Sequence, residues 1–377
     1  MKARYQYRFY PTLQQKASLS QLFGCIRVVW NDALAICKQE AKKPSFNALS
    51  ALLTQSKKTE QRKWLNEVSC VPLQQALRNQ EVAFKNFFDS CKGKRKGKKL
   101  AYPKFKKKAN KQSAEFTNSA FQLKGTQVYL AKIGFIKPVW SRELASDPSS
   151  ATIIKDNADR YFISFVVEIK PIKLPAKNKS VGIDLGIKTF AVLSTGEQFK
   201  SPCYSRLYKG LKKLQRSLSK KQKGSNRRYK ARIRVAKKHN KIAEVRKDFL
   251  HKLSTKIVKK NQLIVLEDLN VTEMLKNVRL SRLINQQGWR EFRCLCEAKA
   301  KKFNREFQVI NQWEPTSQVC SSCGYRWGKL DLKVRKVKCL NCEAVHDRDE
   351  NAAKNIEKVA TGHWETLKTN TEESLLK

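Results

Sequence analysis

Two pairs of cysteines constrain this chain more than any other feature of its sequence. Cys320 and Cys323 are separated by two residues, as are Cys339 and Cys342, and fifteen residues lie between the pairs. Each pair can form a tight knuckle, and four thiolates close a tetrahedral shell around one Zn²⁺. Because four protein ligands leave no open position for water, we expect a structural zinc in a ribbon over residues 316–344.

The charge of the chain predicts a polyanionic partner. Lys and Arg number 79 and Asp and Glu number 32, so the formal net charge is 79 − 32 = +47. Such a balance argues against an ordinary metabolic enzyme and favours nucleic-acid binding. The densest basic stretch, Cys91–Lys111, contains Gly93, Gly97 and Pro103, which favour a loop. Its candidate phosphate contacts are Lys94, Arg95, Lys96, Lys98, Lys99, Lys104, Lys106, Lys107 and Lys108.

The sequence offers little for a membrane or secreted protein. No apolar run approaches the length of a membrane span, and Met1–Tyr5 lacks the apolar core of a signal peptide. Eleven cysteines, most of them scattered, argue against a disulfide framework. We therefore expect a cytoplasmic protein of the prokaryotic cytosol, associated with the nucleoid, with no membrane partner.

The first half of the chain predicts a β domain interrupted by helices. Residues 2–9 alternate apolar and polar side chains like a half-buried strand, which Pro11 ends. Residues 10–90 carry helical apolar stripes, and Pro72 suits the first position of one helix. Short β runs follow from about Ser113 to Lys170, which indicates a small barrel or sandwich that the strand at 2–9 joins.

The second half predicts an α/β domain. Strands are expected at 181–187, 190–194 and 198–199, then at 263–267 and 307–310. Basic helices lie between the third and fourth of these strands, and a helix near 289–305 precedes the fifth. Residues from about 361 are polar and are expected to form a loose tail.

Two acids lie in apolar strands of this domain. Asp184 stands inside Val181–Ile187, where a carboxylate is costly to bury unless a cation or hydrogen-bond donors meet it. Gly182 and Gly186 would leave room for a metal or substrate. Glu267 closes the strand 263–267, and because adjacent strand residues point to opposite faces, either Glu267 or Asp268 can face Asp184, but not both.

A third acid opens a late helix. Asp347 and Glu350 fit the cap and third position of a helix, which leaves Asp349 free to face a site. The reverse roles of Asp347 and Asp349 remain open. His346 is expected to support the site or lie at the surface rather than bind a metal.

Acids on an early strand, a later strand and a late helix are the arrangement of an RNase H-like nuclease. Asp184, Glu267 and Asp349 would then hold Mg²⁺ or Mn²⁺, which favour oxygen ligands. An actin-like ATPase also opens with Ile-Asp-Leu-Gly on a first strand. That fold requires further glycine-rich phosphate loops, which this chain with 14 Gly does not show.

Several segments together resemble the TnpB family of insertion-sequence proteins. They are Tyr7–Pro11, Trp30-Asn31, Gly182–Gly186, Leu266–Asn270, Trp289–Lys299, Thr316–Gly324 and Asp347–Ala353. The resemblance covers nearly the whole chain, and the order and spacing of its motifs are specific. TnpB proteins are similar to the compact ancestors of type V CRISPR effectors.

The resemblance implies a multidomain α+β fold. Residues 1–9 and 113–172 would form a β-barrel wedge domain, and residues 10–112 a helical recognition domain inserted in it. Residues 173–315 and 345–360 would form a RuvC-type nuclease domain that carries the zinc ribbon 316–344 as a target-nucleic-acid-binding insert, with 361–377 as a tail. The nuclease acids of the family map onto Asp184, Glu267 and Asp349.

The resemblance also implies an activity and partners. The chain would be an RNA-guided DNA endonuclease that uses a guide RNA from its own element (an ωRNA) and cleaves double-stranded DNA beside a short adjacent motif. Gln74, Gln75 and Arg78 are candidate readers of that motif by analogy, and a monomer on RNA is favoured. A catalytically silent DNA-binding regulator and a strand-transfer transposase remain alternatives.

Overall fold

The computed structural model describes residues 1–40, 43–95, 97–328, 330–331 and 333–363. The chain divides into two units, residues 1–169 with 222–237 and residues 170–221 with 238–377. Lys96 and most of the tail expected from residue 361 lie outside the described residues. Among the helices described, none is both long and apolar enough to cross a membrane.

The first unit combines two antiparallel sheets with a group of helices. Its five-stranded sheet has the order β2-β7-β8-β1-β6, and β3-β4-β5 form a second sheet. The bounds are β1 Lys2–Phe9, α1 Leu13–Gln39, α2 Phe46–Ser56, η1 Lys63–Glu67, α3 Cys70–Cys91, β2 Gln112–Thr117, η2 Asn118–Ala120, β3 Phe121–Lys124, β4 Gln127–Leu130, β5 Gly134–Ile136, β6 Pro138–Val139, β7 Ser150–Lys155 and β8 Tyr161–Glu168.

The strand expected at residues 2–9 does join the β domain. β1 pairs with β8 in an antiparallel register that sets Tyr7 beside Ile163 and Phe9 beside Tyr161. These side chains enter one core with residues of both sheets and of the helices. That shared core is consistent with a barrel or sandwich, although the backbone ladders of the two sheets are separate.

Helix starts in this unit follow local capping chemistry. Thr12, directly after Pro11, caps α1 in a reciprocal capping box with Gln15. The expectation that Pro72 begins a helix is wrong by two residues, because α3 starts at Cys70. The first four N–H groups of a helix have no intrahelical partner, so proline is tolerated throughout the first turn.

The basic stretch after α3 is a loop, as its glycines and proline predicted. It is fastened to α1 through Trp30 and Asn31. The Trp30 indole donates to the Lys104 carbonyl at 3.1 Å, and the Asn31 amide both donates to the Lys106 carbonyl and accepts from the Lys106 N–H. The Lys106 ammonium lies 4.2 Å from the centre of the Trp30 ring, and burial lowers the pKa of Lys106 to about 8.

The second unit contains a mixed five-stranded sheet in the order β11-β10-β9-β12-β13. β9, β12 and β13 are parallel to one another. β10 is antiparallel to its two neighbours, β9 and β11. The bounds are β9 Ser180–Leu185, β10 Ala191–Leu193, β11 Gln198–Phe199, α4 Ser205–Ser219, α5 Asn226–Lys260, β12 Leu263–Glu267, α6 Val271–Met274, α7 Ser281–Gln287, α8 Trp289–Phe303, β13 Glu306–Ile310, β14 Lys336–Lys338, β15 Val345–Asp347 and α9 Arg348–Ala360.

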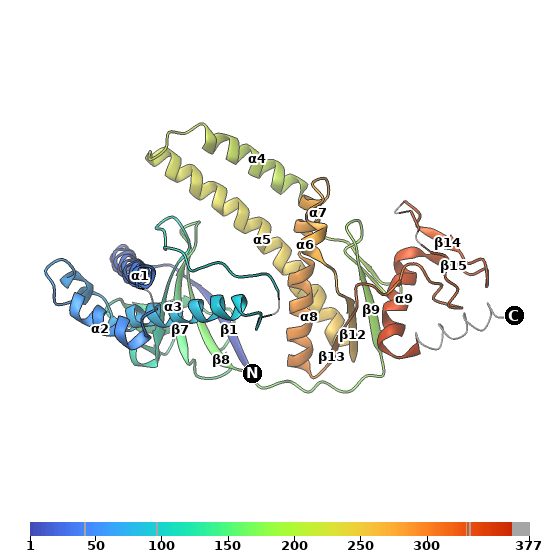
Figure 1. Cartoon of the computed structure of the whole chain (residues 1–377), viewed down its shortest axis with the longest axis horizontal. Helices are drawn as coiled ribbons and strands as arrows, with labels where there is room; N and C mark the ends of the chain where they lie inside the picture. Colours follow the sequence, from blue (N-terminus) through green and yellow to red (C-terminus); the bar gives the residue numbers. More distant parts are fainter. Residues whose placement is uncertain (41–42, 96, 329, 332, 364–377) are drawn as a thin grey trace. The chain divides into compact units, whose positions relative to one another are not determined.

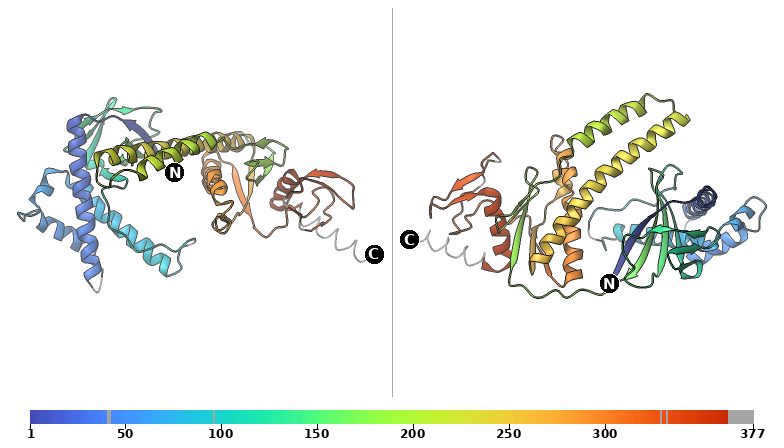
Figure 2. Two further views of the ribbon diagram at one scale, coloured as in Figure 1. Left: turned by 90° about the horizontal axis from the view of Figure 1, so that it is seen from above. Right: turned by 180° about the vertical axis from the view of Figure 1, so that it is seen from behind.

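Helices cover both faces of this sheet. Val181, Ile183, Ile264 and Leu266 pack with the carboxyl-terminal part of α5 and with α8. On the opposite face Val265 packs with Ile356 of α9. Figure 1 shows α8 and α9 on opposite sides of the strands, and both views of Figure 2 keep α9 beside the hairpin β14–β15. β9 and β12 are therefore buried on both faces, which explains their nearly continuous apolar sequences.

Gly182 is the point of closest approach between β9 and α9. A Cβ atom there would lie 2.1 Å from the Ala353 carbonyl oxygen and 2.6 Å from the Glu357 backbone nitrogen. At Gly186 a Cβ would lie 2.7 Å from the Thr189 carbonyl oxygen. The expectation that these glycines leave room for a metal or substrate is therefore wrong, because protein backbone occupies both spaces.

We expect Gly182→Ala to destabilise the second unit by about 1–3 kcal/mol, since the added methyl forces α9 away from the sheet. Urea unfolding followed by circular dichroism measures the loss. Gly210→Ala in α4 is the matched control, because the nearest atom to its Cβ is the flexible end of Lys238, 3.1 Å away. A Gly182→Ala protein as stable as this control would contradict the packing described.

Candidate active site and metal centre

Asp184 and Glu267 come together because β9 and β12 are parallel neighbours. The register pairs Leu266 with Ile183, so the next residues along, Glu267 and Asp184, are side by side at the carboxyl ends of the two strands. Alternation along a strand puts Asp184 on the face of Gly182, where α9 packs. Both acids are half-buried.

Asp268 points away from this group. Its carboxylate pairs with Arg293 of α8, the helix on the other face of the sheet. The choice between Glu267 and Asp268 that the sequence left open is thereby resolved by strand alternation, with Glu267 on the side of Asp184.

Asp349 reaches the same region from the first turn of α9. Asp347 caps the helix, and its carboxylate accepts from the backbone N–H groups of Asp349 at 3.0 Å and Glu350 at 3.1 Å. The capping role expected of Asp347 is confirmed, and Asp349 does not cap this helix. Asp349 is therefore not needed to cap its own helix.

The three acids are electrostatically coupled. Burial, and then the negative charges of Asp349 and Glu267, raise the pKa of Asp184 to about 7. Burial and the charge of Asp268 raise the pKa of Glu267 to about 7. Carboxyl groups with such raised pKa values are typical of catalytic and metal-binding sites, where a cation would compensate the repulsion.

Asp349 is paired with the ribbon. Arg335, directly before β14, donates one guanidinium nitrogen to both carboxylate oxygens of Asp349, at 3.0 and 3.1 Å. Among the described residues, only the four cysteines bring their ligand atoms within 4.8 Å of one another, and the three carboxylates do not. Their all-oxygen donor set nevertheless suits Mg²⁺ or Mn²⁺ in chemistry.

The cysteines predicted from their spacing do converge. Cys320 and Cys342 have sulfur atoms 3.7 Å apart, and the sulfur atoms of Cys323 and Cys339 are 3.6 Å apart. A tetrahedron with Zn–S bonds of about 2.3 Å has sulfur atoms about 3.8 Å apart, so the four residues fit zinc. His346 is buried beside them, with its Nε2 3.1 Å from the Cys320 sulfur.

Two buried asparagines that the sequence analysis overlooked join the cysteine cluster to α9. Asn351 donates to the Val319 carbonyl and accepts from the Ser321 N–H, at 2.7 and 2.8 Å. Asn355, one turn later, donates to the carbonyls of Thr316 and Val319 at 2.7 Å. Their spacing of four residues was the available signal, because it puts two amides on one face of a helix.

Trp313 is a second feature that sequence reasoning missed. β13 pairs Ile310 with Glu267, so the loop that carries Trp313 leaves the sheet at the edge where the acids lie. The Trp313 side chain is 80% exposed. An indole in a polar segment, Gln312-Trp313-Glu314, was the available signal.

The three residues that are candidates for reading the adjacent motif lie on α3 and differ in how exposed they are. Gln74 and Arg78 are exposed, whereas Gln75 is half-buried. The Arg78 guanidinium lies 4.6 Å from the centre of the Phe46 ring, which fixes it against α2. No contact with nucleic acid is established for these side chains or for the lysines of the basic loop, which stay predictions.

We expect Cys320→Ser to lose zinc and to unfold the ribbon locally, because three thiolates and a weaker hydroxyl no longer close the shell. Metal analysis of purified protein measures the zinc content. Cys294→Ser is the control, since Cys294 is exposed on α8 outside the cluster. Full zinc content in Cys320→Ser protein would overturn the assignment.

The raised pKa values predict how stability depends on pH in a buffer without Mg²⁺ or Mn²⁺. The native state binds more protons than the unfolded state between the ordinary pKa values and about 7, so stability falls as the pH rises through that range. Asp184→Asn removes the larger of the two contributions to this loss of stability, because the pKa of Asp184 is raised further than that of Glu267. The melting temperature of this variant relative to wild type should therefore be higher at pH 8 than at pH 5.

Asp248→Asn on α5, an exposed acid paired with Lys252, is the control for this measurement. Its melting temperature relative to wild type should be similar at the two pH values. If the melting temperature of Asp184→Asn relative to wild type were also similar at the two pH values, the electrostatic coupling of the acids would be contradicted.

Known protein families and one solved structure are similar to this chain. Residues 164–278 match the OrfB family of IS605 type, described as a probable transposase, residues 289–356 match a Cas12f1-like TNB domain, and residues 1–44 match a helix-turn-helix domain of the OrfB type. A Cas12f1–sgRNA–target DNA complex solved by cryo-EM has a similar fold, with a TM-score of 0.53, 14% identity, and coverage of 91% of this chain and 83% of that chain.

Two relatives are similar along nearly their whole length, and both are provisionally named RNA-guided DNA endonuclease. One, from Streptomyces pristinaespiralis, is 45% identical over 365 residues, which cover 94% of this chain and 89% of the relative. The other, InsQ of Escherichia coli K12, is 30% identical over 383 residues, which cover 95% of this chain and 92% of the relative. The chain belongs to the TnpB family, whose members include the OrfB proteins of IS605 type.

Proposed function

We propose that this chain is an RNA-guided DNA endonuclease that cleaves double-stranded DNA by metal-assisted hydrolysis at Asp184, Glu267 and Asp349. The names of its relatives support the activity class. The observation that carries the assignment of the site is the raised pKa of Asp184, which is caused by burial and by the charges of two acids far away in sequence. Two oxygen-seeking divalent cations, when bound, would activate a water and stabilise the leaving 3′ oxygen.

The acids themselves would hold the reacting groups in place. Asp184 and Glu267 lie on paired strands, which gives them a rigid spacing. Asp349 would complete the ligand set when its carboxylate turns from Arg335. Hydrolysis breaks the bond between phosphorus and the 3′ oxygen, and the water oxygen remains on the phosphorus.

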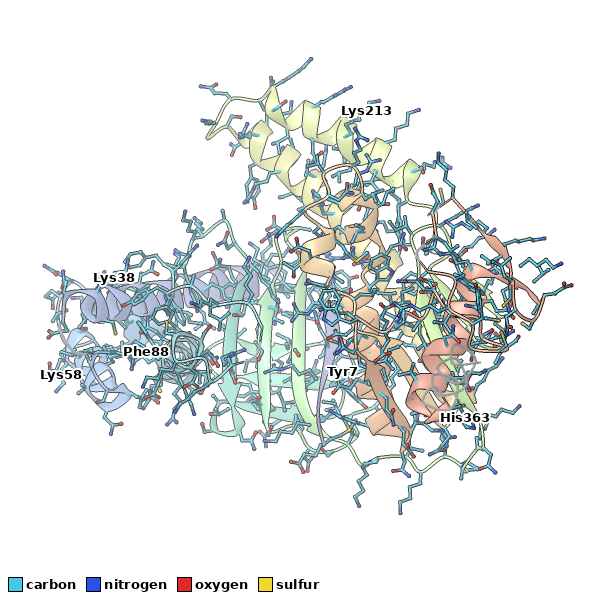
Figure 3. All side chains as sticks on the ribbon, turned by 45° about the vertical axis from the view of Figure 1, so that its right-hand side comes forward. Tyr7, Lys38, Lys58, Phe88, Lys213 and His363 are labelled. Carbon is cyan, nitrogen blue, oxygen red and sulfur yellow. The ribbon has the colours of Figure 1, made fainter. Side chains whose placement is uncertain are left out.

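Basic and aromatic surfaces of the second unit support binding of nucleic acid. α4 exposes a run of cations, among them Lys213, which is labelled in Figure 3. The other exposed cations of α4 are Arg206, Lys209, Lys212 and Arg216. Trp313 at the edge of the sheet offers a face on which an unpaired base can stack.

The domain assignment remains part of the proposal. A RuvC-type, RNase H-like core is supported by the five-stranded mixed sheet and by helices on both of its faces. The wedge domain at 1–9 and 113–172 and the recognition domain at 10–112 are consistent with the first unit, to which residues 222–237 also contribute. A monomer on a guide RNA, a short motif beside the target and a nucleoid location complete the proposal.

We expect Asp184→Asn to abolish cleavage of a matched, motif-bearing duplex while binding of guide RNA is kept, because the change removes a ligand charge and leaves the strand intact. Cleavage is measured on gels with guide RNA and Mg²⁺, and RNA binding by filter retention. Asp248→Asn on α5 is the matched control, since its exposed carboxylate pairs with Lys252 and has no part in the raised pKa values of Asp184 and Glu267.

The alternatives give different results in the same assay. Binding without cutting by wild-type protein would indicate a silent regulator. Joined products in place of breaks would indicate a strand-transfer transposase. Cleavage of DNA by the Asp184→Asn protein would contradict the proposed role of the three acids in the reaction.

A further inference from the structure

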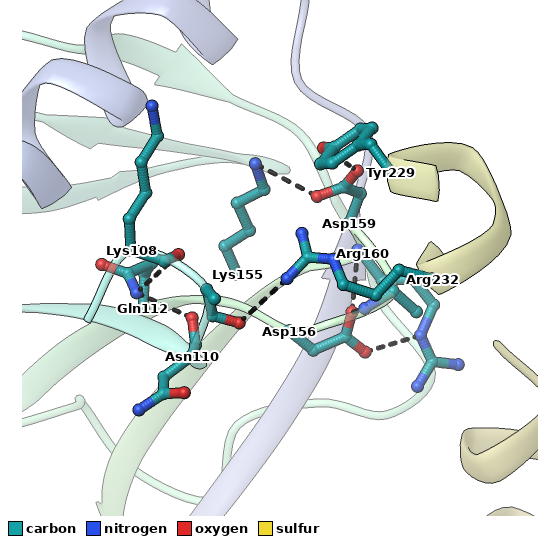
Figure 4. Close-up of polar contacts among 11 residues, drawn as sticks. Lys108, Asn110, Gln112, Lys155, Asp156, Asp159, Arg160, Tyr229 and Arg232 are labelled. Carbon is teal, nitrogen blue, oxygen red and sulfur yellow. Dashed lines mark hydrogen bonds and ion pairs between the residues drawn. The ribbon is translucent and has the colours of Figure 1, made fainter. Parts of the chain in front are cut away.

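A polar pocket in the first unit has no role in the nuclease chemistry. Its volume is about 180 Å³, and four segments from distant parts of the sequence line it. They are α1, the end of the basic loop, the turn between β7 and β8, and the first turns of α5, which all belong to the same unit (Figure 4). The nuclease acids lie in the other unit.

The two acids of the pocket are already engaged. Asp159 accepts a hydrogen bond from the Tyr229 hydroxyl at 2.7 Å and pairs with Lys155 at 3.2 Å. Asp156 accepts from the Arg160 side chain at 2.8 Å and from the backbone N–H of Arg160 at 2.9 Å. The hydrogen bond from Tyr229 to Asp159 fastens α5 to the β7–β8 turn (Figure 4). Because both acids are paired with cations, the remaining charge of the pocket is positive.

That remaining charge comes from three cations. Within the part of the chain that the structure describes, neither Arg27 nor Lys108 has a carboxylate partner within 4.0 Å. The Arg232 guanidinium donates to the Ala109 carbonyl at 3.4 Å and lies 5.2 Å from the centre of the Tyr229 ring. Arg27 and Arg232 are half-buried, and a half-buried guanidinium without a counter-charge is costly unless an anion binds it.

The rim of the pocket is held in shape by Gln112. Its amide donates to the carbonyls of Lys107 at 3.1 Å, Lys108 at 3.4 Å and Asn110 at 2.7 Å. The end of the basic loop is thereby folded into a fixed turn. Lys108 and Asn110 line the pocket from this turn.

We propose that this pocket binds one backbone phosphate, with its ribose, of an unpaired nucleotide in the RNA partner. Guanidinium groups bind phosphate through fixed pairs of donors, and Lys108 adds a point charge. The volume suits one sugar-phosphate unit and excludes a duplex. The inference rests on the proposed function, since it assigns a contact to the RNA that the function requires.

RNA is favoured over DNA by the neutral side chains of the pocket. Asn110 and Asn157 line it beside the cations. An amide can both donate to and accept from a 2′-hydroxyl, which is the group that distinguishes RNA from DNA. The same pocket without amides would bind either backbone equally.

The test compares two double variants that remove the same charge. One is Arg27→Gln with Lys108→Gln, and the control is Lys16→Gln with Lys58→Gln, which removes two exposed cations outside the pocket. The affinity of an unstructured single-stranded RNA is measured over a range of salt concentrations. Because the contact with one phosphate is lost, the slope of log K against log salt should fall in magnitude by about 0.7. The control should change the slope by less than half of that.

Chemical substitution in the RNA locates the contact. Neutral methylphosphonate linkages are introduced one at a time, and one position should weaken binding by wild-type protein several-fold but leave the pocket variant unaffected. The pocket variant should lose less affinity for a DNA of the same sequence than it loses for the RNA. Equal losses in DNA and RNA would overturn the assignment to RNA.

The outcomes separate this inference from the proposed function. Wild-type protein that binds no RNA would contradict the function itself. Wild-type protein that binds RNA, with equal slopes for the pocket and control variants, would overturn the pocket alone. Equal melting temperatures of the two variants establish that the pocket variant is folded.

Discussion

The contact between α9 and β9 at Gly182 is the constraint on which the second unit depends. The absence of a side chain lets helix backbone approach strand backbone more closely than any Cβ would allow. Asp349 begins the same helix, and Asp184 lies two residues after Gly182 on the same strand. The closeness of the strand acid and the helix acid is therefore a consequence of one glycine.

The resulting site is electrostatically unfavourable by itself. Asp184 is half-buried close to Glu267 and Asp349, and burial and like charges hold its pKa at about 7. In the function proposed above, bound divalent cations would offset this cost. The cysteine cluster differs in kind, because four thiolates would complete the shell of a zinc ion and leave no position for substrate.

Much of this arrangement could be predicted from the sequence because short-range rules determine it. The cysteine spacing predicted the cysteine cluster, strand alternation limited the choice to Glu267 or Asp268, and the capping pattern favoured Asp347 over Asp349 as the helix cap. The role of Gly182 could not be predicted, because it depends on a helix 170 residues later. The buried amides of Asn351 and Asn355, and the anchoring of the basic loop by Trp30, depend on tertiary contacts in the same way.

In the ion pair between Arg335 and Asp349, a side chain of the ribbon holds the carboxylate that the proposed metal site would need. A guanidinium that engages both oxygens of Asp349 leaves neither of them fully available to a cation. By thermodynamic reciprocity, whatever draws Arg335 away favours cation loading, and cation loading frees Arg335. A polyanion that binds Arg335 would therefore release the Asp349 carboxylate from this ion pair.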